Sequence, residues 1–135
     1  MWSLGAVAAE LVLGTFLYGV DNEYDALRAI AETQGQPPDE VLDQGKCSLY
    51  YFQKRKKCLH RWRLMTPQVF GRQTGNHYKN QLDVLGCLKC IVDVMEKTYG
   101  VQQDQEVLID LIIDMLNLDP KDRISPQGAL DHLFF

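Results

Sequence analysis

The 135-residue sequence has no basic residue ahead of its first apolar run, and it has only four cysteines. A secretory signal peptide carries positive charge before its apolar core, so the absence of lysine and arginine before Leu4 argues against one. The apolar run, residues 4–20, is near the shortest membrane span, and Glu10 lies within it, where a carboxylate is costly in lipid. We expect no membrane association, and reduced thiols in a nuclear or cytoplasmic protein.

The sequence also lacks the motifs of ATP-dependent phosphoryl transfer. No glycine-rich loop follows a strand-like run, and no His-Arg-Asp, Asp-Phe-Gly or Ala-Pro-Glu triplet occurs. These groups cradle the phosphates, hold magnesium and accept the proton of the attacking hydroxyl. We therefore expect no catalytic, cofactor-binding or metal-binding residue for that reaction among these 135 residues.

Positive charge is concentrated in one place. Six basic residues and no acidic ones lie between Lys54 and Arg63, whereas the rest of the chain has eight basic and eighteen acidic residues. Tyr50, Tyr51 and Phe52 precede this basic island, and Trp62 lies near its end. A solvated loop is the favoured interpretation, ahead of an import signal or partner contact, with a nucleic-acid site the least favoured. The candidate import signal is Lys54, Arg55, Lys56 and Lys57.

Cys87 and Cys90 have the two-residue spacing of metal and redox sites. A zinc site would need two further ligands, for which the sequence offers Cys47, Cys58, His60 and His77. Both cysteines, however, fall in an apolar pattern of helical period, and cysteine is commonly buried. We favour a structural role in the core.

Apolar periodicity predicts a mainly α-helical chain. The expected helices are 3–13, 22–32, 80–99, 104–116 and a short one after Ser125, with a helical turn at 39–42 and a candidate strand at 48–52 in an irregular stretch, 45–78. Ser3 and Ser125 are expected N-caps, and Gly14 is an expected stop. Helix 3–13 is apolar on every side, which predicts that it is the most buried helix.

Motifs at both ends resemble protein kinases. Trp2, Ser3 and Gly5 resemble the Asp-x-Trp-Ser-x-Gly motif that opens the central F helix, although the motif's aspartate is missing. Residues 116–124 are similar to the loop before the last kinase helix, and Arg123 would correspond to the arginine that pairs with the glutamate of Ala-Pro-Glu.

The middle of the chain resembles homeodomain-interacting protein kinases, which belong to the CMGC group. Residues 23–25 and 33–37 are similar to their G helix, and residues 62–67 are similar to their insert. The resemblance implies a partial kinase domain at 1–135, truncated before the F helix. It would contain helices F to I of the C-terminal lobe, with an insert between G and H at about 45–104.

The resemblance implies ATP- and magnesium-dependent serine/threonine phosphorylation of nuclear regulatory proteins, with the catalytic groups upstream of Met1. Arg123 would then have lost its glutamate partner and remain an unpaired, desolvated charge. Glu10 would be either a peptide-substrate contact or part of a structural ion pair. We expect a kinase fragment that is not catalytically self-sufficient. The alternatives are a truncated binding module that docks partners through the G helix and insert, and, less favoured, an unrelated helical adaptor.

Overall fold

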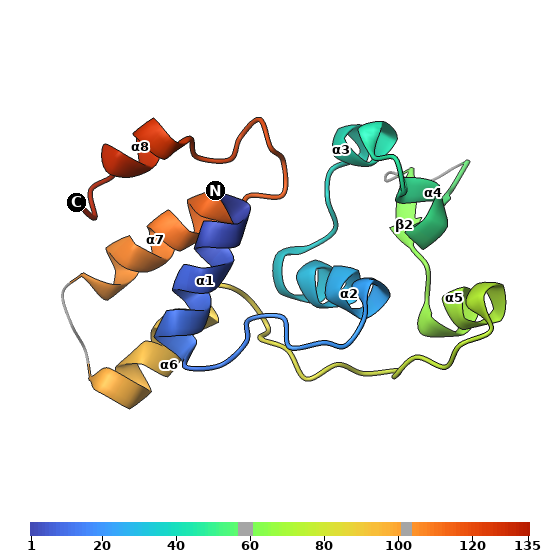
Figure 1. The fold of residues 1–135 in the computed structure, drawn as a ribbon, viewed down its shortest axis with the longest axis horizontal. Helices are drawn as coiled ribbons and strands as arrows, with labels where there is room; N and C mark the ends of the chain where they lie inside the picture. The colour runs from blue at the N-terminus through green and yellow to red at the C-terminus, as the bar shows by residue number, and fades with distance from the viewer. Residues whose placement is uncertain (57–60, 101–103) are drawn as a thin grey trace. The chain divides into compact units, whose positions relative to one another are not determined.

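The computed structural model describes residues 1–56, 61–100 and 104–135, and the chain divides into two compact units. Unit 1 combines residues 1–19 with residues 84–135, and unit 2 is residues 20–83 (Figure 1). The expectation of a mainly helical protein is confirmed. The division after Asp83 falls inside the expected insert at 45–104.

Unit 1 is helical throughout its regular, described part. Its helices are α1 (Trp2–Leu13), α6 (Cys90–Tyr99), α7 (Gln105–Met115) and α8 (Pro126–Leu130). Helix α1 packs against α6 and α7, which also pack against each other (Figure 1). Their shared core is formed by the buried side chains of Ala9, Leu17, Leu88, Ile91, Met95, Ile109, Ile112 and Leu116.

Short sequence signals set several helix ends in unit 1. Gly14 ends α1 in the left-handed region at φ 69°, as expected. The Ser125 hydroxyl accepts the Gly128 N–H over 3.0 Å, so it caps α8 as expected, with Pro126 at the first helical position. The expected Ser3 cap is wrong, because α1 already begins at Trp2 and Ser3 lies within its first turn.

The prediction that the first helix is the most buried is wrong within its unit. Only Gly5 and Ala9 of α1 are buried, whereas the side chain of Leu11 is 77% exposed and those of Leu4 and Val7 are about half exposed. The physical reason is that α6 and α7 cover only part of the surface of α1. Leu4, Val7 and Leu11 therefore face solvent, whereas Trp2, Ala6, Ala8, Val12 and Leu13 pack partly against the core.

Unit 2 combines short helices with a small hairpin. Its elements are α2 (Glu23–Gln34), α3 (Asp39–Gln44), α4 (Ser48–Tyr51), β1 (Phe52–Lys54), β2 (Trp62–Leu64) and α5 (Pro67–Thr74). The strands are antiparallel, with Phe52 opposite Leu64. One apolar cluster surrounds Tyr24 and Phe70, whose rings stack at 4.2 Å, and a second contains Leu42, Phe52 and Trp62.

The stretch expected to be irregular is largely ordered. Residues 48–51 form α4, so the candidate strand at 48–52 is wrong except that β1 begins at Phe52. The stretch also holds β2 and α5, which Thr66 caps and Gly75 ends. Tertiary contacts, rather than a local period, stabilise these short elements.

The helix expected at 80–99 begins only at Cys90. Two carbonyls near its expected start, those of Lys79 and Asn80, accept hydrogen bonds from Arg28 and are therefore held by unit 2. Gly86 adds an unfavourable helix residue between them and α6. The apolar period continues through 80–89, but Arg28 holds the carbonyl at the start of this segment and the regular helix forms only from Cys90.

Candidate functional site

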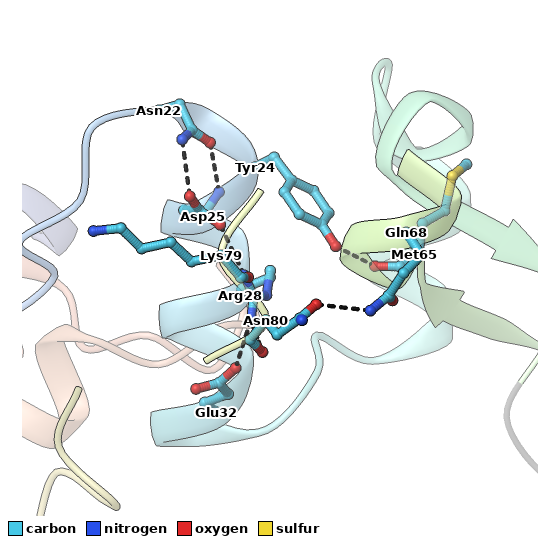
Figure 2. Close-up of polar contacts among 9 residues, drawn as sticks. All are labelled: Asn22, Tyr24, Asp25, Arg28, Glu32, Met65, Gln68, Lys79 and Asn80. Carbon is cyan, nitrogen blue, oxygen red and sulfur yellow. Dashed lines mark hydrogen bonds and ion pairs between the residues drawn. The ribbon is translucent and has the colours of Figure 1, made fainter. Parts of the chain in front are cut away.

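A buried ion-pair network organises the polar side of α2 (Figure 2). The Arg28 guanidinium lies 2.9 Å from the Asp25 carboxylate, with side-chain exposures of 6% and 10%. It also donates to the carbonyl oxygens of Lys79, at 2.6 Å, and Asn80, at 2.9 Å. A more exposed carboxylate, Glu32, lies 3.6 Å from the same guanidinium. Arg28 therefore fastens the 79–80 segment to α2.

Two further side chains, Asn22 and Tyr24, fix the start of α2 (Figure 2). The Asn22 side chain accepts the Asp25 N–H and donates to the Asp25 carboxylate, both over 2.9 Å, so it caps the helix and orients the partner of Arg28. The Tyr24 hydroxyl donates to the carbonyl oxygen of Met65 over 2.6 Å. Burial raises the pKa of Tyr24 to about 12, so the hydroxyl remains a donor at neutral pH.

The basic island lies on the hairpin, where carboxylates of α3 neutralise part of it. Arg61 lies 2.7 Å from Asp43, and Lys54 lies 3.6 Å from the same residue. The Lys54 ammonium also sits 4.6 Å from the centre of the Trp62 ring. The other α3 carboxylate, Asp39, accepts the backbone N–H groups of Arg61 and Trp62.

Asp43 is the carboxylate most affected by this arrangement. The Trp62 indole N–H donates to it over 3.0 Å. That bond, followed by the charges of Arg61 and Lys54, lowers the pKa of Asp43 below its ordinary value. The pairing shows that two cations of the island serve the packing of the hairpin.

The described residues of the candidate import signal are all exposed: Lys54, Arg55 and Lys56. Lys54 also pairs with Asp43 of α3 while its side chain stays 58% exposed. Lys57 lies outside the described residues. The import function stays a prediction.

A groove of about 530 Å³ runs along α5 and the segment after it. It is lined by Pro67, Gln68, Gly71, Arg72, Gly75, Asn76, His77, Tyr78 and Asn80. A Cβ atom at Gly71 would lie 2.6 Å from the Asn76 carbonyl oxygen, so helix and loop approach more closely than any side-chain-bearing residue would allow. Arg72 and His77 are both exposed and supply polar groups on the lining.

The structure brings three of the kinase-motif residues into packing roles within unit 1. The Arg123 guanidinium lies 5.3 Å from the centre of the Trp2 ring, and its Nε donates to the Asn117 carbonyl oxygen over 2.9 Å. Arg123 is half-buried and hydrogen-bonded, so the expectation that its charge is desolvated is wrong, whereas none of the ion pairs among the described residues gives it a carboxylate partner. Gly5 lies against α7, whereas Ser3 is exposed.

Glu10 lies beside the exposed side of α1. Its Oε1 accepts the Leu17 N–H over 3.3 Å, which ties the loop after the helix back to α1. None of the ion pairs found in 1–56, 61–100 and 104–135 includes Glu10, so of its two expected roles the structural ion pair is not formed there, and the peptide-substrate contact stays a prediction. It lines a shallow apolar groove of about 380 Å³ with Val7, Leu11, Gly14, Thr15 and Phe16.

Cys87 and Cys90 are free and half-buried, which corrects the expectation that they sit in the core. Cys87 precedes α6, because the helix begins at Cys90. Among the described residues, no three histidine, cysteine or acidic side chains cluster as metal ligands. Two of the other ligands considered for zinc, Cys58 and His60, lie outside these residues.

No helix of the described ranges is both long and apolar enough to span a membrane.

Sequence reasoning missed the Arg28 network and the α5 groove. The local sequence signal for the network was Asn22, a capping residue, followed by Asp25 and Arg28 at a spacing of three. This pattern is common on solvated helices, so it did not single out a buried network. Its other partners lie 51 and 52 residues away, beyond any local pattern.

No protein-family model matches the chain. Similar proteins are nevertheless found among curated sequences. The chain is 35% identical over 143 residues to homeodomain-interacting protein kinase 1 of Mus musculus, and 36% identical over 143 residues to homeodomain-interacting protein kinase 2 of Mesocricetus auratus. It is also 33% identical over 150 residues to homeodomain-interacting protein kinase 4 of Homo sapiens.

Each match covers 99% of this chain. The chain spans 12% of the length of the first two relatives and 24% of the third. The similarity therefore extends over nearly all of this sequence and is limited to a small part of the relatives.

Proposed function

Since this chain is homeodomain-interacting-protein-kinase-like and corresponds to one part of such kinases, we propose that it is the helical second half of a kinase C-terminal lobe. In this assignment α1 is the F helix, α2 the G helix, α7 the H helix and α8 the I helix. The insert between G and H is residues 45–104. The larger protein would be a serine/threonine kinase of the CMGC group that acts on nuclear regulatory proteins.

Within that kinase, this part supplies structure and not phosphoryl transfer. The observation that carries the proposal is that the match to the kinases spans 99% of the chain, yet the sequence holds none of the phosphate, magnesium or proton-transfer motifs. The residues present do not fit Mg-ATP either. The described residues contain no metal-ligand cluster, and the groove beside Glu10 is mainly apolar.

Isothermal titration calorimetry of the 135-residue chain with Mg-ATP tests this role. We expect no saturable heat and no phosphate transfer to a generic protein substrate, while a complete homeodomain-interacting protein kinase domain measured in parallel gives both. Saturable binding that disappears when a residue of this chain is replaced would contradict the proposal.

Protein docking is a second candidate function, favoured by the preformed groove of α5. Of the two docking faces expected from the sequence, the G helix α2 has Tyr24, Asp25 and Arg28 buried and is poorly suited to bind a partner. The groove lies in the insert and offers exposed polar groups at Arg72 and His77. The names of the relatives suggest a homeodomain as the partner to test.

The test is binding of a purified homeodomain to the chain, measured by biolayer interferometry. If the groove binds it, Arg72→Glu combined with His77→Ala weakens affinity by about tenfold or more, whereas Lys89→Glu, an exposed change in unit 1, leaves it unchanged. No binding by the unmodified chain contradicts docking of this partner, and equal affinity of the groove variant contradicts the groove.

A further inference from the structure

Cys87 and Cys90 occupy the two ends of one hydrogen-bonded turn that leads into α6. The Cys90 N–H donates to the Cys87 carbonyl oxygen over 3.2 Å, and the Ile91 N–H donates to the Leu88 carbonyl oxygen over 3.0 Å. A turn closed in this way keeps the Cα atoms of its first and fourth residues within about 7 Å. Disulfides join Cα atoms about 4.4–6.8 Å apart. The backbone therefore already holds the two cysteines near disulfide distance.

Their side chains also meet. Interaction with the Cys87 side chain, ahead of burial, raises the pKa of the Cys90 thiol above its ordinary value. Cys90 therefore retains its proton at neutral pH, while the turn keeps it beside Cys87. Both residues are half-buried, so small molecules have access to them.

The surroundings favour thiol chemistry over metal binding. No third ligand joins the two cysteines among the described residues. Lys89, between them, is exposed, and neither cysteine belongs to the buried core. A pair of adjacent, accessible thiols on a preformed turn suits disulfide exchange, because its second step needs the thiols to meet.

We propose that Cys87 and Cys90 form a reversible dithiol–disulfide pair that reacts with small disulfides of the glutathione type. The Cys87 thiolate attacks one sulfur of the small disulfide, whose S–S bond breaks and releases one thiolate. The Cys90 thiol then loses its proton to the released thiolate, and its sulfur attacks the Cys87 sulfur of the mixed disulfide. A second small thiolate leaves and takes up the proton that Cys87 lost to solvent. Two protein thiols are oxidised, and one small disulfide is reduced to two thiols.

The disulfide would fix the entrance of α6. Leu88 lies inside the closed turn and Ile91 follows it directly, and both are buried in the core of unit 1. Closing the turn would therefore restrain the position of α6 on its neighbours α1 and α7.

Peptide mapping tests the pair, because trypsin cleaves after Lys89, between the two cysteines. The reduced chain is incubated with oxidised glutathione, alkylated and digested without reduction, in the native chain and in a Cys47→Ser, Cys58→Ser background. We expect peptides 80–89 and 90–97 joined by a disulfide, which dithiothreitol separates. Should the double background fail to fold, the native chain decides, because the joined peptides identify the pair by themselves.

Two controls make the result specific. Cys87→Ser in the same background abolishes the joined peptides, and the folded chain forms the link several-fold faster than the urea-unfolded chain. Cysteines that end up separately alkylated or separately bound to glutathione, with no joined peptides, overturn the proposal. Equal rates in the folded and unfolded chains also overturn it, because the turn would then contribute nothing.

Discussion

Single residues in this protein gain their roles from partners that are remote in sequence. Arg28 pairs with Asp25 one turn away, but it also binds carbonyls 51 and 52 residues further along the chain. The indole N–H of Trp62, 19 residues further along the chain, likewise lowers the pKa of Asp43. Of the two, the buried Arg28–Asp25 pair is strongly destabilising when one partner is removed, because the other charge remains desolvated.

Arg28→Ala should therefore destabilise unit 2. We expect a loss of about 3–5 kcal/mol in the free energy of unfolding, since Asp25 would remain buried without its cation. Urea titration followed by circular dichroism measures it. Arg63→Ala, an exposed change on β2, is the control and should stay within about 0.5 kcal/mol of the unmodified chain. A loss at Arg28 no larger than at Arg63 would show that the network is not formed.

Acid should loosen the hairpin through Asp43. The indole bond from Trp62 and the charges of Arg61 and Lys54 lower its folded pKa. The carboxylate therefore contributes stability above the ordinary aspartate range, and this contribution is lost as pH falls through the lowered pKa. Trp62 fluorescence in a Trp2→Phe chain follows this transition.

Asp43→Asn should remove that part of the acid transition. The control is Glu40→Gln, an exposed carboxylate on the same helix, which should preserve it. An unchanged acid transition in Asp43→Asn would contradict the assignment to this carboxylate.

At the scale of elements, α1 shows how a uniformly apolar helix can be only partly covered. The residue that limits its approach to α7 is Gly5, where a Cβ atom would lie 2.7 Å from the Met115 Cβ. The opposite part of the helix has no cover within unit 1, and Leu11 is mostly exposed. The loss in the free energy of unfolding caused by a substitution should therefore differ sharply between positions of α1.

Gly5→Ala should destabilise unit 1 by about 1–3 kcal/mol, because the added methyl group separates α1 from α7. Gly86→Ala is the matched control. A Cβ atom at Gly86 meets no atom within 4 Å, so the same chemical change should be tolerated. Thermal unfolding followed by circular dichroism compares the two, and equal midpoints would contradict the close approach of α1 to α7.

Leu11→Asp should leave the helicity and the unfolding midpoint of the chain nearly unchanged, within about 0.5 kcal/mol. The sequence-based prediction that this helix is the most buried implied the opposite result, but at this exposed position the new carboxylate would be solvated. Ala9→Asp, two residues earlier and fully buried, should prevent stable folding. Loss of solubility and helicity in Leu11→Asp would show that this side of α1 is covered.

At the scale of the molecule, the two units have separate cores and different charge. Unit 1 has ten acidic and four basic residues, and unit 2 has eight acidic and ten basic residues. The basic island, with its partners on α3, lies wholly in unit 2. Each core contains side chains of its own unit only.

Because the two units have separate cores, a mutation in one unit should change the local unfolding of that unit alone. Arg28→Ala should weaken the amide hydrogen-exchange protection of α2 and the hairpin while leaving α6 and α7 unchanged, and Gly5→Ala should do the reverse. Hydrogen-exchange mass spectrometry of the full chain resolves the two. Equal loss of protection across both units in either variant would mean that the chain unfolds as one cooperative body.

The sequence by itself determined the mainly helical fold, the stops and caps at Gly14 and Ser125, and the similarity to homeodomain-interacting protein kinases. These features depend on side chains within one turn of each other or on continuous motifs. The tertiary structure alone decided that Arg28 holds residues 79 and 80, that α6 begins at Cys90 and that Leu11 is exposed. Each of these depends on which distant segment competes for a backbone group or covers a surface, and no local period contains that information.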